Sequence, residues 1–273
     1  MSWGRTGAEA ASPVTAAREH YDSWRIASRA GTELRALRKL LDQGHDPDEI
    51  RRRADLLSNE VIAAELATAY PDDPVLSEES ADNSERLDSR RVWIVDPLDG
   101  TREFGEPDRS DWAVHVALVV DRTPAAGAVA LPVRGLTLAT MPAWKLPPVR
   151  HRKPRMVVSR TRPPRMALEV AERMGATLVE MGSAGAKAMS VLLGDSEIYL
   201  HAGGQYEWDS AAPAAVSAAS GLHVSRTDGS PLMYNSESAW LPDLLICRRE
   251  YAGQVLGIIA ELTRGEEASS QPA

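Results

Sequence analysis

Hydrophobic residues recur every three or four positions in two early segments, which is the period of an amphipathic helix. Gly44 ends the first segment, 21–41, whose recurring apolar positions are Trp24, Ala27, Ala30, Leu34, Leu37 and Leu41. Tyr70-Pro71 ends the second, 54–69, in which Leu57, Val61 and Ala64 share one face. The chain is therefore expected to start with two helices that each bury one face.

Short runs rich in β-branched residues follow these helices and predict strands. In the front half the strands are VLSEES, RVWIVD, an antiparallel pair around a turn at 121–124, and GLTLATM. In the back half, strands alternate with helices from MVVS at 156–159 to a closing helix at 251–263. A front half of the α+β kind and a back half of the α/β kind predict a layered α/β protein.

The same order of elements suggests two lobes. We expect an N-terminal α+β lobe at 15–150, which also holds the metal site argued below, and a C-terminal α/β lobe at 151–263. Residues 1–14 and 264–273 are polar or small and predict disordered ends.

Charge and cysteine content narrow the function classes. The net charge of −8 argues against a nucleic-acid binder, and it would repel an anionic substrate unless the local charge is reversed. The single cysteine, Cys247, excludes an intramolecular disulfide and a cysteine-based zinc site, and it fits a reducing cytoplasm. The N-terminus shows no signal peptide, and no apolar run is long enough to span a membrane.

The stretch WIVDPLDGTREF carries the clearest chemical signal, because a predicted buried strand ends there in two aspartates. Pro97 favours the second position of a turn, and Gly100 permits a positive φ and close approach of a ligand. A turn would bring Asp96 and Asp99 together, with the Leu98 carbonyl on the same side. Mg²⁺ prefers such oxygen donors, and two bridged ions can activate water. An ordinary surface turn is the alternative.

Further carboxylates favour the metal-site interpretation. Glu78 and Glu79 end a strand upstream of the motif. Asp209 stands at the start of a predicted helix, where an aspartate also serves as an N-cap. His115, in the middle of an apolar strand, is interpreted as a core histidine, and His201 as a packed one.

With these residues in view, the chain resembles the lithium-sensitive, magnesium-dependent phosphatases of the inositol monophosphatase superfamily. The acidic pair, the Asp-Pro-Leu-Asp-Gly-Thr motif and the late Trp-Asp of that superfamily stand here as SEE, DPLDGT and EWD, in that order. The stretches DPLDGTREF, GSAGAKAM and LHAGGQYEWDSAAP are most similar to one branch, the 3′-phosphoadenosine 5′-phosphate phosphatases of CysQ type in their actinobacterial form. The resemblance covers residues 20–262 and implies a layered αβαβα sugar-phosphatase fold.

The resemblance also implies a cofactor of two Mg²⁺ ions. Glu78, Asp96 and the Leu98 carbonyl would hold the first ion, and Asp96, Asp99 and Asp209 would hold the second. A third ion is left open, because a lysine and a threonine that many relatives carry before the second helix are absent from HDPDEIRRRAD.

Catalytic and substrate contacts are implied in the same way. Thr101 and Glu79 would orient the attacking water, and Asp55 would hydrogen-bond Thr101. The substrate would contact Gly100, Thr101, Gly182, Ser183, Lys187 and Glu207. The basic segment 149–165, which includes Arg160, Arg162 and Arg165, either meets a second phosphate group or is a solvated loop.

The function implied is a Mg²⁺-dependent, Li⁺-sensitive 3′(2′),5′-bisphosphate nucleotidase that converts adenosine 3′,5′-bisphosphate to AMP and phosphate. The sulfated form of the nucleotide is a further candidate substrate. Two alternatives stay open: a sugar phosphatase of the inositol monophosphatase or fructose-1,6-bisphosphatase type, and an inactive metal-binding regulatory relative. The sequence does not fix the oligomeric state, a homodimer included, or the preference between Mg²⁺ and Mn²⁺.

Overall fold

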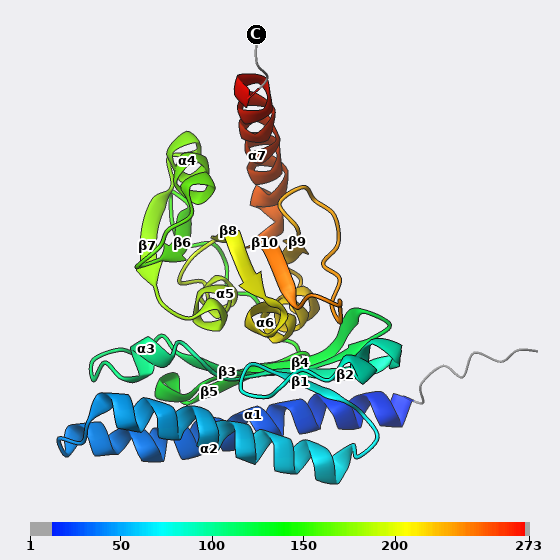
Figure 1. The fold of residues 1–273 in the computed structure, drawn as a ribbon. Coiled ribbons are helices and arrows are strands. Elements are labelled where there is room, and N and C mark those ends of the chain that lie inside the picture. Colours follow the sequence, from blue (N-terminus) through cyan, green and yellow to red (C-terminus); the bar gives the residue numbers. More distant parts are fainter. Residues whose placement is uncertain (1–12, 271–273) are drawn as a thin grey trace, which may run out of the picture.

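Two five-stranded sheets alternate with three layers of helices in the computed structural model, which describes residues 13–270 (Figure 1). The order of the layers is αβαβα, as the resemblance implies. Residues 1–12 and 271–273 lie outside the described residues, and so does most of the predicted N-terminal disorder. None of the described helices combines the length and the apolar character that crossing a membrane requires.

The first sheet rests on two long antiparallel helices, α1 (Pro13–Asp42) and α2 (Pro47–Ala69) (Figure 1). Its strand order is β1-β2-β3-β4-β5, with β1 parallel to β2 and the other pairs antiparallel. The strands are β1 (Val75–Ser77), β2 (Arg91–Asp99), β3 (Ala113–Val120), β4 (Thr123–Leu131) and β5 (Leu136–Ala139). Short helical turns join them: η1 (Ser84–Asp88), α3 (Thr101–Phe104) and η2 (Pro132–Arg134).

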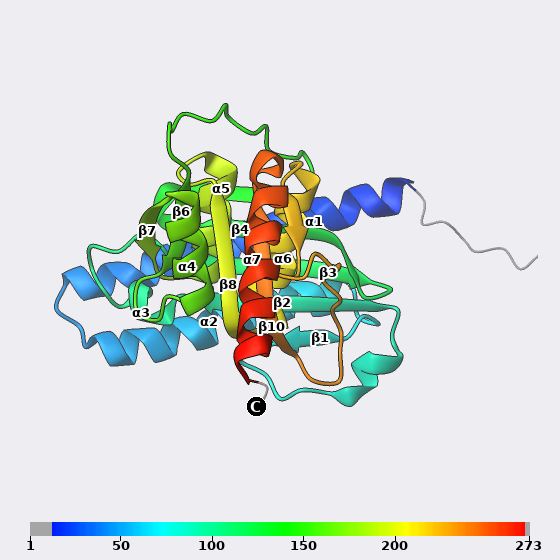
Figure 2. The ribbon, with the colours of Figure 1, turned by 90° about the horizontal axis from the view of Figure 1, so that it is seen from above.

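The second sheet has the strand order β7-β6-β8-β10-β9 and mixes parallel and antiparallel pairs. Its strands are β6 (Arg155–Ser159), β7 (Thr177–Met181), β8 (Ile198–Tyr206), β9 (His223–Ser225) and β10 (Trp240–Cys247). Helices α5 (Ala184–Leu193) and α6 (Glu207–Ala219) lie between the sheets. Helices α4 (Arg165–Met174) and α7 (Arg249–Ser270) cover its outer face (Figure 2).

Alternation along β2 determines which side chains face the middle layer. Val92 and Ile94 pack between the sheets, whereas Trp93 and Val95 pack against α1 and α2. Successive side chains of a strand point to opposite faces. Asp96 therefore continues the row that points toward α5 and α6.

The elements predicted from the sequence are present, but several run further than expected. Helix α2 starts at Pro47, with Asp46 as its N-cap, rather than near Ala54. Helix α7 continues past Thr263, where the closing helix was expected to end, to Ser270. Glu and Ala, which follow Gly265, have good helix propensities, and this explains the extension.

Candidate metal centre and adjoining cleft

Strand β2 carries Asp96 and Asp99 on the same face because it contains a bulge. Asp96 lies opposite His115 and Asp99 lies opposite Ala113, so three steps along β2 match two along β3. Residues three apart in a regular strand would face opposite sides, and the extra residue resets the alternation. Pro97, which has no N–H for the ladder, lies within this irregularity. The turn expected at 96–99 is thus a bulged strand, which ends at Gly100 with φ of 89°.

The start of helix α5 holds the Asp99 carboxylate in place. The Ser183 hydroxyl and the backbone N–H groups of Ala184 and Gly185 donate to it, the last two at 3.1 and 2.6 Å. Burial alone would raise the pKa of Asp99, but His115, Lys187 and the Ser183 hydrogen bond lower it to about 2. Asp99 is therefore ionised across the physiological pH range.

The other acidic groups near Asp99 are harder to ionise. Burial first, and then the charges of Asp99, Glu78 and Asp209, raise the pKa of Asp96 well above its usual value. Burial first, and then the charges of Asp209, Asp99 and Glu79, raise the pKa of Glu78 to about 7. Burial and the charge of Asp99 raise the pKa of Asp209 to about 6. These four carboxyl groups come from β2, the end of β1 and the start of α6, and they repel one another.

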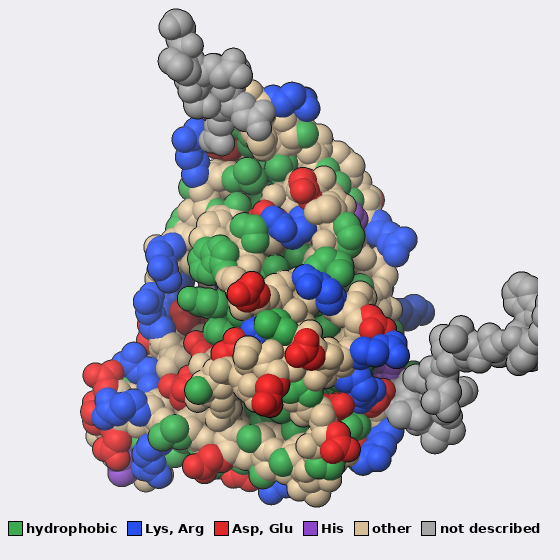
Figure 3. All heavy atoms as spheres, turned by 45° about the vertical axis from the view of Figure 1, so that its right-hand side comes forward, with side chains coloured by type: hydrophobic (Ala, Val, Ile, Leu, Met, Phe, Trp, Pro, Cys, Tyr) green, Lys and Arg blue, Asp and Glu red, His purple; other side chains and the backbone are tan. Residues whose placement is uncertain are grey.

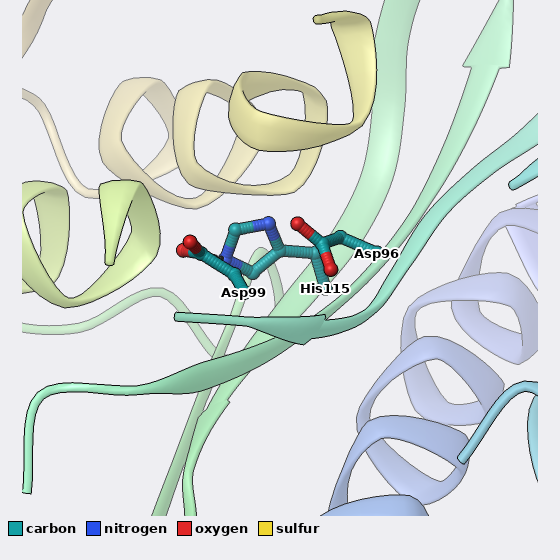
Figure 4. Close-up of side chains that lie close together, drawn as sticks. All are labelled: Asp96, Asp99 and His115. Carbon is teal, nitrogen blue, oxygen red and sulfur yellow. Dashed lines mark ion pairs between the residues drawn. The ribbon is translucent and has the colours of Figure 1, made fainter. Parts of the chain in front are cut away.

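His115 lies inside this cluster, with its imidazole ring between the carboxyl groups of Asp96 and Asp99 (Figure 4). Its Nε2 is 3.2 Å from an Asp99 oxygen, and its Nδ1 is 3.0 Å from the Trp208 carbonyl oxygen. Burial acts to lower the pKa of His115, but its contact with Asp99 outweighs this and raises it. His115 is fully buried as predicted, yet it also contacts the site, which the sequence pattern did not indicate. His115 lies opposite Asp96 in the pairing of β2 with β3, and this pairing is what brings it to the site. The sequence alone does not give that register.

The donor set fits a hard divalent cation. One ligand atom each of Asp96, Asp99 and His115 lies within 4.8 Å of the others. Carboxylate oxygens at the end of a buried strand suit Mg²⁺, and a cation would relieve the repulsion that raises the pKa values of Asp96 and Asp209. The Leu98 carbonyl oxygen lies beside these groups, where it accepts a hydrogen bond from the Thr101 hydroxyl at 3.1 Å.

Thr101, the first residue of α3, connects the acidic cluster to helix α2. Its Oγ1 is 3.4 Å from a carboxylate oxygen of Asp55, so the expected contact between these residues is present. Burial and the charge of Glu79 raise the pKa of Asp55 to about 6, which places Glu79 near the same pair. Asp55, Glu79 and Thr101 therefore form a second polar group beside the carboxylates.

The start of helix α6 separates two acidic residues that adjoin Trp208 in the sequence and were both expected at the site. The Asp209 carboxylate faces the cluster and also accepts a hydrogen bond from the Tyr206 N–H at 2.7 Å. Tyr206 is the N-cap residue, so Asp209 caps the helix from its third position and not as the N-cap that was considered from the sequence. Glu207 is fully buried and accepts hydrogen bonds from the N–H groups of Asn235 and Ser236 at 2.7 and 2.9 Å. The structure does not bring Glu207 to the cleft, because those two amides engage its carboxylate.

A cleft of about 630 Å³ opens next to the cluster, a volume typical of small-molecule sites. Of the residues predicted to contact metal or substrate, it is lined by Asp99, Gly100, Thr101, Gly182, Ser183, Lys187 and Asp209. Lys187 is only 5% exposed, and its Nζ donates to the carbonyl oxygens of Gly182 and Ser183. Three aromatic residues of the lining were not predicted from the sequence: Tyr199, which is buried, and Tyr206 and Trp240, which are 46% and 48% exposed.

Charges of both signs lie on the face of the molecule that Figure 3 shows, where acidic and basic side chains are interspersed. The net charge of −8 would repel an anionic ligand, so cationic groups within the cleft itself are needed to attract one. The cationic side chains among the lining residues that the structure describes are Arg102, Arg162 and Lys187.

Comparison with known proteins agrees with this geometry. The sequence pattern of the inositol monophosphatase family matches residues 15–262. The 3′-phosphoadenosine 5′-phosphate phosphatase of Mycobacterium leprae is 44% identical over 250 residues, which cover 87% of this chain and 92% of that protein. The protein of the same name from Mycobacterium tuberculosis (strain CDC 1551 / Oshkosh) is 47% identical over 228 residues, which cover 80% of this chain and 85% of that protein.

Solved structures show the same fold. The crystal structure of CysQ from Bacteroides thetaiotaomicron, a bacterial member of the inositol monophosphatase family, superimposes with a TM-score of 0.74 at 25% identity. The match covers 85% of this chain and 97% of that chain. Staphylococcal IMPase-II superimposes with a TM-score of 0.71 at 20% identity, over 93% of this chain and 99% of that one.

Proposed function

The chain belongs to the inositol monophosphatase family, and we propose that it is a Mg²⁺-dependent, Li⁺-sensitive phosphatase that removes the 3′-phosphate of adenosine 3′,5′-bisphosphate. The products are AMP and phosphate. The observation that supports this substrate most is the identity of 44–47% to the two mycobacterial proteins that carry the name 3′-phosphoadenosine 5′-phosphate phosphatase. The convergence of Glu78, Asp96, Asp99 and Asp209 supports the metal dependence.

Carboxylates from three elements would hold the metal. Glu78, Asp96 and the Leu98 carbonyl are proposed for one ion, and Asp96, Asp99 and Asp209 for a second. Bound Mg²⁺ would supply positive charge for the phosphate and its leaving oxygen and would lower the pKa of a bound water. Of these ligands, Asp99 is the one whose carboxylate is already ionised and fixed in position, because the amides of α5 and His115 contact it.

The residues beside the cluster would position the reacting groups. Thr101 and Glu79 are proposed to orient the water, with Asp55 aligning the Thr101 hydroxyl through the contact at 3.4 Å. The amides of Gly100 and Thr101 are proposed to receive a phosphate oxygen. Lys187 is more buried than a direct phosphate ligand needs to be, so we assign it to fixing the Gly182–Ser183 backbone and to keeping Asp99 ionised.

Phosphate release from adenosine 3′,5′-bisphosphate tests the proposal directly. We expect activity with Mg²⁺, none in EDTA, and a loss of at least about a hundredfold in kcat for Asp99→Asn. Asp195→Asn is a matched control, because Asp195 is a half-exposed acidic residue away from the cleft whose partner is Arg134. Activity that survives both chelation and Asp99→Asn would refute the metal mechanism.

A substrate panel separates this proposal from its closest alternative. Inositol monophosphate, fructose 1,6-bisphosphate and adenosine 3′,5′-bisphosphate would meet the same carboxylates, so the cluster cannot distinguish them. The proposal requires the highest kcat/KM for the nucleotide. A higher value for inositol monophosphate would make the chain a sugar phosphatase of the same family.

A further inference from the structure

The segment between β6 and α4 carries Arg160 and Arg162, and Arg165 follows as the first residue of α4; the structure gives these three arginines different roles. Arg160 donates to Glu103 at 2.7 Å and to Glu106 at 2.6 Å, so two carboxylates neutralise it. Arg165 pairs with Glu169 at 2.5 Å within α4. The Arg162 side chain has no hydrogen bond or ion pair among the described residues, and it lines the cleft.

Arg162 reaches the cleft from the second sheet, whereas Thr101 and Arg102 reach it from the first. Burial lowers the pKa of His201, and the charges of Lys187 and Arg162 lower it further, which places the Arg162 guanidinium near β8. Arg102 adjoins Thr101, on the side where the scissile phosphate is proposed to lie. Arg162 is thus an exposed, uncompensated cation carried by the opposite wall of the cleft.

Two half-exposed aromatic side chains, Tyr206 and Trp240, line the same cleft. Tyr206 and Trp240 meet edge to face, with ring centroids 5.5 Å apart and an interplanar angle of 81°. Gly204 has φ of +89°, and a Cβ there would overlap the Trp240 ring, so the indole packs directly on this backbone. Half-exposed rings fixed in this way can stack on a planar base.

These observations lead to one assignment, which rests on the proposed function. We propose that Arg162 binds the second phosphate group, the 5′-phosphate, of a nucleoside 3′,5′-bisphosphate. A guanidinium can form two parallel hydrogen bonds to a phosphate, and only an arginine without an acidic partner offers its full charge for this. Arg162 would thereby select bisphosphate nucleotides over nucleoside monophosphates and inositol phosphates.

The test compares adenosine 3′,5′-bisphosphate with adenosine 3′-monophosphate, which lacks only the 5′-phosphate. For Arg162→Gln we expect the KM for the bisphosphate to rise about tenfold or more, with kcat little changed. The KM for the monophosphate should stay within about twofold of the wild-type value. Arg162→Lys should recover part of the lost selectivity, because it keeps the charge without the bidentate geometry.

Arg165→Gln is the matched control, since Arg165 lies in the same region but is paired with Glu169. It should leave both KM values unchanged. The assignment is wrong if Arg162→Gln changes neither KM, or if it changes both by the same factor. If the wild-type protein hydrolyses neither nucleotide, the proposed function fails and this assignment falls with it.

Discussion

The Nε2 atom of His115 lies 3.2 Å from a carboxylate oxygen of Asp99, and this pair joins β3 to the end of β2 beneath the start of α5. Replacing His115 with Leu would leave Asp99 buried with one charged partner fewer. We expect a loss of about 3 kcal/mol in the free energy of unfolding, as for other broken buried pairs. Urea denaturation in EDTA measures it. His45→Leu, at an exposed histidine, is the control, and an equal effect of both substitutions would contradict the prediction.

Gly185 faces the same histidine from helix α5. A Cβ at Gly185 would overlap the Nε2 atom of His115, closer than real Cβ contacts come. Gly185→Ala should therefore destabilise the protein by at least about 2 kcal/mol, although alanine is the better helix former.

A double-mutant cycle identifies the cause of that loss. The cost of Gly185→Ala should fall by more than half when His115 is also replaced with Ala, because the two positions are in contact. Gly253→Ala, in α7, should be neutral or slightly stabilising, because a Cβ at this position would meet no atom within 4 Å. Additive costs of the two substitutions would show that Gly185 and His115 do not clash.

Residue patterns predicted the elements well, because each helix and strand of this chain buries one or two regular faces. The acidic motif was also recognisable, since an ordinary surface turn does not require two further acidic stretches in a fixed order along the chain. The geometry of Asp96 and Asp99 was not predictable, because it depends on a bulge defined by pairing with β3. Local sequence favoured a turn there, and pairing with β3 as far as Asp99 overrode that preference.

Long-range contacts account for the other differences. Glu207 and Asp209 flank Trp208 in the sequence, but two steps along a helix turn a side chain by about 200°, so their carboxylates point in different directions. The partners of Glu207, Asn235 and Ser236, lie in a loop that no local pattern connects to it. The contact of His115 with the site was missed for the same reason, because it depends on the register between β2 and β3.

Glu207 is accordingly expected to matter for stability and not for substrate affinity. Glu207→Ala would leave the buried N–H of Asn235 and the N–H of Ser236 without their acceptor, at a cost of about 3 kcal/mol in the free energy of unfolding. The KM for adenosine 3′,5′-bisphosphate should stay within about twofold of wild type at a temperature where the variant is folded. A large rise in KM without loss of stability would restore Glu207 to the substrate site.

Lithium should inhibit the enzyme if the cluster binds Mg²⁺ as proposed. Li⁺ is small and prefers oxygen donors, but it carries half the charge, so it can occupy a carboxylate site without supplying the same stabilisation of phosphate. We expect inhibition at submillimolar to millimolar LiCl in a phosphate-release assay, with NaCl and KCl at the same ionic strength as controls. Full activity at high LiCl would indicate a site unlike the one proposed.

Removal of metal should make the stability of the protein depend on pH in a defined direction. The pKa values of Glu78 and Asp209 are raised to about 7 and about 6, whereas carboxyl groups of an unfolded chain titrate near a pKa of about 4. Between about pH 4 and 7 the folded state binds more protons, so the free energy of unfolding falls as pH rises. The raised pKa of His115 acts in the same direction. The lowered pKa of Asp99 acts in the opposite direction, but only below about pH 4.

In EDTA, the urea midpoint should therefore be lower at pH 8 than at pH 5, by an amount equivalent to about 4 kcal/mol. Saturating Mg²⁺ should reduce this difference, because it binds the deprotonated carboxylates and gains affinity as they ionise. Asp209→Asn, which removes one raised pKa, should flatten the profile in EDTA and weaken the effect of Mg²⁺. A midpoint that rises with pH in EDTA would mean that these carboxyl groups do not repel one another in solution, and the case for a shared metal site would lose its electrostatic basis.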